Sequence, residues 1–157
     1  MIRILVVEDS QVVAILLSAI LNQQEEMTVV GRAGNGEEAL EMAARLKPDL
    51  ITMDIRMPVM DGFEATRRIM STQPVPIVVI SSSVDCEELK ITFRAIEEGA
   101  LAVIEKPRGL GHPDFESIRR NLVETVRAMA EVKLVRRILL RPPRTEQPPL
   151  PAPIPDL

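Results

Sequence analysis

The sequence of 157 residues predicts an α/β domain in which a parallel sheet carries helices on both faces. Two observations lead to this fold class. Short apolar runs alternate with longer stretches of helical periodicity, and three of the runs are continuous Val, Ile and Leu, which is typical of strands covered on both faces. The five predicted strands are residues 2–7, 27–31, 50–54, 77–81 and 101–105.

Four helices are predicted between these strands, at residues 10–23, 35–46, 62–72 and 86–98. Ser10 is suited to cap the first helix, and Gly34-Asn35-Gly36 supplies the turn into the second. Asp61 precedes the third helix and is expected to cap it rather than to act in catalysis. The first helix has an apolar face made of Val12, Val13, Leu16, Leu17, Ile20 and Leu21.

A fifth helical pattern begins at Pro113 and can run to about Leu140. Its apolar stripe consists of Phe115, Ile118, Leu122, Val126 and Met129. The ending "RPPRTEQPPLPAPIPDL" is too rich in proline to continue a helix and is typical of a linker or tail.

Bulk composition limits the class of protein. The net charge of -4 and the pI near 5.2 argue against a nucleic-acid partner. The single Cys86 excludes an internal disulfide framework. Because no apolar stretch approaches the roughly 20 residues of a membrane span and the first residues do not form a secretory signal, we expect a cytoplasmic protein without membrane insertion.

Polar side chains follow four of the predicted strands, at the edge where parallel sheets bind ligands. Glu8 and Asp9 follow the first strand, and Asp54 ends the third. Ser81 ends the fourth strand and Lys106 follows the fifth. We therefore expect three carboxylates, a hydroxyl and an ammonium group to converge at one edge of the sheet.

Three clustered carboxylates repel one another unless a cation joins them. Oxygen ligands without His or Cys favour Mg²⁺ over a transition metal. A Mg²⁺ ion bound by two acids beside a third leaves one carboxylate oxygen free as a nucleophile, while Lys106 and the Ser81 hydroxyl are available to bind phosphoryl oxygens. The pattern predicts phosphoryl transfer to an aspartate.

Each of these features has a simpler explanation when it is taken alone. An acidic pair after a strand can serve a helix N-terminus, an aspartate at a strand end can be a cap, and Lys-Pro and serine runs occur in turns. Their joint occurrence at the same end of successive strands favours a functional site.

The segments "VVEDS", "MDIRMPVMDG", "VVISSS" and "EKP" resemble the receiver domain of two-component response regulators. The resemblance covers about residues 1–130 and implies a flavodoxin-like (βα)5 doubly wound fold with strand order 2-1-3-4-5 and an extended C-terminal helix. Residues 131–157 are then the end of the connecting helix and a Pro-rich interdomain linker.

This resemblance also implies roles for the acids. Asp54 matches the aspartate that accepts the phosphoryl group and also contacts Mg²⁺. Asp9 matches the direct metal ligand, and Glu8 matches the acid that acts through water. The main-chain carbonyl of Arg56 falls where the family supplies another metal ligand.

Further implied roles concern the fourth and fifth strands. Ser81, with Ser82 beside it, matches the switch hydroxyl, and Lys106 matches the ammonium that contacts the phosphoryl group. Pro107 follows a peptide bond that is cis in this family. Val103 departs from the family pattern, because Tyr or Phe often stands there, so a readout by rotation of a ring is excluded.

The segment "FRAIEEGALAVIEKPRGLGHPDFESIRRNLVETVRAMAEVKLVRR" resembles the receiver and connecting helix of chemotaxis protein-glutamate methylesterases. That class has a C-terminal esterase domain with a Gly-rich serine motif, which these residues do not contain. We therefore expect a chain truncated in its interdomain linker. The apolar residues near its end are expected to contact the missing domain or a second chain; they are Leu134, Val135, Ile138 and Leu139.

The resemblance implies that a chemotaxis-type histidine kinase phosphorylates Asp54 and so switches an attached methylesterase. The chain itself would only gain and slowly lose the phosphoryl group. Alternatives are a stand-alone receiver that acts by partner binding and a truncated DNA-binding regulator. A phosphatase on the haloacid-dehalogenase plan is disfavoured, because Arg56 occupies the position of its second acid.

Overall fold

The computed structural model describes residues 1–81, 87–107, 109 and 111–132, and it contains a parallel sheet of five strands. The strands are β1 (Ile2–Val7), β2 (Met27–Ala33), β3 (Leu50–Asp54), β4 (Ile77–Ser81) and β5 (Ala102–Glu105). Their order is β2-β1-β3-β4-β5, and every neighbouring pair is parallel. The predicted fold class and strand order are confirmed. The second strand runs two residues beyond its expected end at Gly31.

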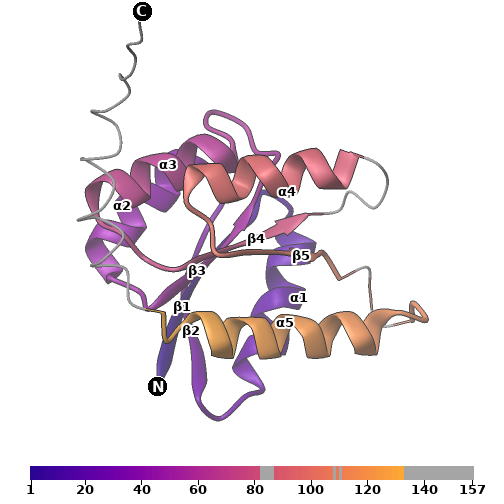
Figure 1. The fold of residues 1–157 in the computed structure, drawn as a ribbon. Helices are drawn as coiled ribbons and strands as arrows, with labels where there is room; N and C mark the ends of the chain where they lie inside the picture. Colours follow the sequence, from indigo (N-terminus) through magenta and orange to yellow (C-terminus); the bar gives the residue numbers. More distant parts are fainter. Residues whose placement is uncertain (82–86, 108, 110, 133–157) are drawn as a thin grey trace, which may run out of the picture.

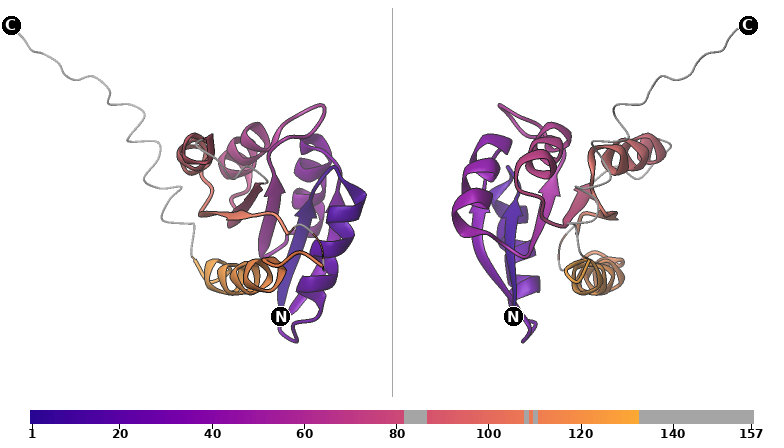
Figure 2. Two further views of the ribbon diagram at one scale, coloured as in Figure 1. Left: turned by 90° about the vertical axis from the view of Figure 1, so that its right-hand side faces the viewer. Right: turned by 60° about the vertical axis from the view of Figure 1, so that its left-hand side comes forward.

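Two helical layers enclose the sheet (Figure 1 and Figure 2). Helices α1 (Gln11–Asn22) and α5 (Phe115–Met129) cover one face, where their apolar sides pack against residues such as Val6 and Ile80. Helices α2 (Gly36–Leu46), α3 (Gly62–Thr72) and α4 (Glu87–Glu98) cover the other face. All five residues of β3 and of β4 are buried, which is typical of central strands covered by helices on both faces and explains their mainly apolar sequences.

Polar side chains begin three of the helices as the sequence predicts. The Ser10 hydroxyl accepts a hydrogen bond from the Val13 N–H at 3.4 Å. The Asn35 side chain accepts one from the Glu38 N–H, and the Asp61 carboxylate accepts one from the Glu64 N–H, both at 2.9 Å. Asp61 is therefore a helix cap.

Helix α5 is shorter than the sequence pattern suggests. It begins at Phe115 and ends at Met129, whereas the expected helix ran from Pro113 to about Leu140. Residues 130–132 are no longer helical, and the rest of the expected helix, from residue 133, lies outside the described residues. Cys86, the Pro-rich ending and the apolar residues from Leu134 to Leu139 lie outside the described residues.

Within the described part of the chain, no helix is both long and apolar enough to cross a membrane.

Candidate metal centre

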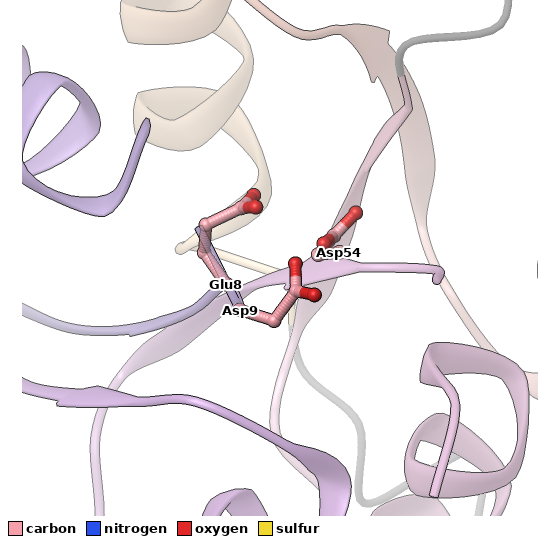
Figure 3. A group of neighbouring side chains, drawn as sticks. All are labelled: Glu8, Asp9 and Asp54. Atoms are coloured by element: carbon pink, nitrogen blue, oxygen red, sulfur yellow. The ribbon is translucent and has the colours of Figure 1, made fainter. Parts of the chain in front are cut away.

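The acids that follow β1 and β3 form one cluster. Val7 pairs with Met53 in the sheet, so the next residues, Glu8 and Asp54, also lie side by side. One carboxylate oxygen from each of Glu8, Asp9 and Asp54 lies within 4.8 Å of the other two. Figure 3 shows the three side chains projecting toward a common space from the ends of their strands. The predicted convergence of the acids is confirmed.

A lysine that directly follows β5 also reaches into this cluster. The Nζ atom of Lys106 lies 3.3 Å from Asp54 Oδ1 and 3.4 Å from Glu8 Oε1. Its backbone is fixed because the Lys106 N–H donates to the Ser81 carbonyl oxygen at 2.9 Å. One ammonium group stands against three carboxylates, so the cluster keeps an excess of negative charge.

Backbone groups support two of the acids. The Ile55 N–H donates to Asp54 Oδ1 at 2.9 Å, and the Ser10 N–H donates to Glu8 Oε2 at 3.2 Å. The second oxygen of Glu8, Oε1, is buried, and among the described residues only the Lys106 ammonium, at 3.4 Å, approaches it, without a well-formed hydrogen bond. A buried carboxylate oxygen with so little donor support is costly, and a cation or water bound to one would lower that cost.

The electrostatics of the cluster oppose ionisation of its buried acids. Burial, together with the neighbouring Asp54, raises the pKa of Glu8 from 4.5 to about 7, although Lys106 opposes the rise. Burial also raises the pKa of Asp54, and Lys106 again opposes the rise. The single positive charge of Lys106 therefore does not compensate the burial of these two acids.

These observations fit a magnesium site. The donors are all oxygen atoms, one buried oxygen accepts no hydrogen bond from the described residues, and Asp9 is exposed, so that water can complete the coordination of an ion. Mg²⁺ prefers such sites, with one or two carboxylates and several waters. The residues that would hold it are Asp9, Asp54 and, through water, Glu8.

The loop after β3 closes tightly on Asp54. The Gly62 N–H donates to the Ile55 carbonyl at 2.8 Å. A Cβ atom at Gly62 would lie 2.1 Å from the Asp54 carbonyl oxygen, so only glycine fits. The sequence placed Gly62 in the loop but did not predict this contact.

The remaining predicted site residues differ in their placement. Ser81 is buried at the end of β4, at the same edge as Asp54, and Val103 packs against the core. Arg56 is exposed and follows Ile55 in the loop, whereas Ser82 lies outside the described residues.

No peptide bond among the described residues is cis, so the expected cis bond before Pro107 is wrong. Trans is the isomer that X-Pro bonds intrinsically prefer.

A hollow beside the acids was missed by sequence reasoning. It has a volume of about 350 Å³ and is lined by Gln11, Arg32, Gly34 and Glu38 together with Glu8 and Asp9. Its walls come from α1, the end of β2 and the start of α2. No motif joins these segments in the sequence, so the sequence carries no signal for the hollow.

Comparison with known proteins adds to this geometry. The family model of the response regulator receiver domain matches residues 4–112. A protein-glutamate methylesterase/protein-glutamine glutaminase of Nitrosospira multiformis is 53% identical over 137 residues, which cover 87% of this chain and 39% of the relative. The corresponding protein 1 of Syntrophus aciditrophicus is 50% identical over 157 residues, covering all of this chain and 44% of the relative. The chain thus spans about two fifths of the length of these relatives.

A solved structure agrees with the relatives. The response regulator domain of Thermotoga maritima CheB superposes with a TM-score of 0.76 at 41% sequence identity. The match covers 85% of this chain and 98% of that domain.

Proposed function

The chain belongs to the receiver domains of response regulators, of the type found in CheB methylesterases, and on this premise we propose that Asp54 accepts a phosphoryl group from a histidine kinase. The observation that carries the proposal is the placement of Asp54. Its carboxylate is buried at the end of β3, within reach of two further acids and 3.3 Å from the Lys106 ammonium. A carboxylate in this setting can attack phosphorus while nearby positive charge stabilises the transferred group.

The transfer exchanges one bond for another. An oxygen of Asp54 forms a bond to phosphorus, and the bond from phosphorus to the kinase imidazole nitrogen breaks. The electron pair of that bond stays on the imidazole. The Ile55 N–H holds the Asp54 carboxylate in orientation, so the attack needs little reorganisation of the side chain.

Positive charge is needed where three acids meet the incoming anion. When bound by Asp9, Asp54 and the Arg56 carbonyl, with Glu8 acting through water, Mg²⁺ would offset the charge of the phosphoryl oxygens. Lys106 provides the protein's own cation, and its buried stem directs the ammonium group to Asp54. The Ser81 hydroxyl, at the same sheet edge, is the proposed switch group that approaches the phosphoryl oxygens.

Phosphorylation is proposed to regulate a domain beyond these residues. The matched relatives are more than twice as long as this chain and are named as methylesterases. Residues 1–130 would form the receiver and residues 131–157 the linker to a methylesterase domain that acts in the cytoplasm. The reading frame after residue 157 tests this: a stop codon there would favour a stand-alone receiver instead.

Replacement of the nucleophile tests the phosphoryl-transfer proposal directly. With acetyl phosphate and Mg²⁺, the wild-type chain should gain the mass of one phosphoryl group, and Asp54→Asn should gain none, as measured by intact-protein mass spectrometry. Asp61→Asn is the matched control. It also removes a carboxylate near the site, but Asn caps a helix as well as Asp does, so labelling should persist. Labelling of the Asp54→Asn protein at the wild-type rate would contradict the assignment.

A further inference from the structure

Helices α3 and α4 lie side by side on the same face of the sheet (Figure 1 and Figure 2). Phe63 and Arg67 stand one turn apart on α3. They meet Arg94 and Glu98, which stand one turn apart on α4. The guanidinium carbon of Arg94 lies 4.4 Å from the centre of the Phe63 ring, and Arg67 Nε lies 3.8 Å from Glu98 Oε1. A cation–π contact and an ion pair therefore join the two helices at successive turns.

The contact of Arg94 with Phe63 is the one that reaches into the protein. The Arg94 side chain is 59% exposed, and its ion pair with Glu98, at 3.9 Å, adds little stability in such a setting. Phe63, in contrast, is only 8% exposed and belongs to the core on this face of the sheet. A surface cation on α4 is thus linked to a buried ring on α3.

Phe63 directly follows Gly62, the residue that lies against Asp54. A Cβ atom at Gly62 would lie 2.1 Å from the Asp54 carbonyl oxygen, so the first turn of α3 rests on the peptide unit between Asp54 and Ile55. The N–H of that same peptide unit donates to Asp54 Oδ1 at 2.9 Å. Because a peptide unit is planar, a shift of Gly62 against its carbonyl also turns the N–H that orients the carboxylate.

We propose that Arg94 is a positioning residue for Asp54. Through the Phe63 ring it holds the first turn of α3, and with it the peptide after Asp54, in the arrangement that presents the carboxylate to phosphorus. This inference rests on the proposed function and adds a residue of α4 to it. The connection does not pass through position 103, where Val103 has no ring to rotate.

The rate of labelling by acetyl phosphate with Mg²⁺, followed by intact-protein mass spectrometry, measures this role. Arg94→Gln should slow labelling about threefold, the size expected for the loss of a cation–π contact at an exposed site. Arg94→Lys keeps a cation within reach of the ring and should label faster than Arg94→Gln. Lys90→Gln is the matched control, because it removes one positive charge from another exposed position on α4 and should label at the wild-type rate.

A double-mutant cycle distinguishes action through the ring from a general effect on the fold. Phe63→Leu keeps an apolar side chain in the core and removes the ring. If Arg94 acts through the ring, adding Arg94→Gln to Phe63→Leu should slow labelling by less than about 1.5-fold. Urea unfolding of the same proteins shows whether each variant is folded under the labelling conditions.

Absence of labelling in the wild type would contradict the proposed function itself. With a wild type that is labelled, equal rates for Arg94→Gln and the wild type would overturn the role of Arg94 alone. A threefold loss that persists in the Phe63→Leu background would also overturn it, as would an Arg94→Lys protein that labels as slowly as Arg94→Gln. A loss of the same size in Lys90→Gln would assign the effect to surface charge and refute the positioning role.

Discussion

Glu8 should make the metal-free protein less stable as the pH rises. Its side chain is buried beside Asp54, and burial raises its pKa from 4.5 to about 7. A carboxyl with a higher pKa in the folded chain than in the unfolded chain binds its proton more tightly when folded. Loss of that proton therefore lowers the free energy of unfolding as the pH rises from about 4.5 through 7. Glu8→Gln keeps the shape of the side chain and removes this titration.

The size of the effect follows from the two pKa values. A rise from 4.5 to about 7 corresponds to roughly 3 kcal/mol, at about 1.4 kcal/mol per pKa unit. Near pH 4.5 the glutamate is mostly protonated in the folded chain, and the variant should match the wild type. At pH 8 the variant should be more stable by about 3 kcal/mol in the absence of metal. Saturating Mg²⁺ should shrink this difference, because a cation stabilises the ionised glutamate.

Urea unfolding at a series of pH values, with EDTA present, measures the difference between the two proteins. The wild type should lose stability between pH 5 and pH 8 more steeply than Glu8→Gln. A wild-type stability that rises over this window, or a variant that is less stable at pH 8, would refute the reasoning about the buried acid.

Two further substitutions test the surroundings of Asp54. Lys106→Gln should cost about 3 kcal/mol at pH 8 but clearly less at pH 5, where Glu8, with its pKa raised to about 7, takes up a proton. Urea unfolding at both pH values checks this, and equal losses would contradict it. Gly62→Ala should cost about 2–4 kcal/mol and slow acetyl phosphate labelling, because its Cβ atom would meet the Asp54 carbonyl at 2.1 Å. Gly111→Ala, which meets no atom within 4 Å, is the control and should change the stability by less than about 0.5 kcal/mol.

Local patterns in the sequence predict most of the fold. Apolar runs predict the bounds of β3 and β4 to the residue, because strands buried on both faces are built mainly of apolar side chains. Side-chain caps mark helix starts, as Ser10, Asn35 and Asp61 demonstrate. The end of α5 could not be read in the same way. Its helical pattern continues beyond Met129, whereas residues 130–132 are not helical, and the pattern alone does not mark the last turn.

The candidate site, too, was predicted from the sequence only in part. The convergence of Glu8, Asp9 and Asp54 follows from strand direction alone, since parallel strands end at one edge. Val59, in the loop after β3, has a φ of +70°, and Gly62 lies against the Asp54 carbonyl. Both features depend on how this loop folds back on its strand, which residue types do not specify. The trans bond before Pro107 shows the limit of a carried-over feature: a motif matched residue for residue did not reproduce the expected isomer.

The two unfavourable features near Asp54 differ in what can relieve them. The raised pKa of Glu8 reflects first its burial and then the neighbouring Asp54, and a bound cation would offset both, so its cost to folding depends on metal and pH. The strain at Val59 lies in its backbone, where a β-branched residue has a φ of +70°, and neither metal nor protons remove it. A stability gain from Val59→Asn should therefore persist with Mg²⁺ and at every pH, whereas the gain from Glu8→Gln should depend on both. If the two gains responded alike to Mg²⁺, the loop strain and the acid cluster would be coupled, and the separate physical origin of the two costs would be refuted.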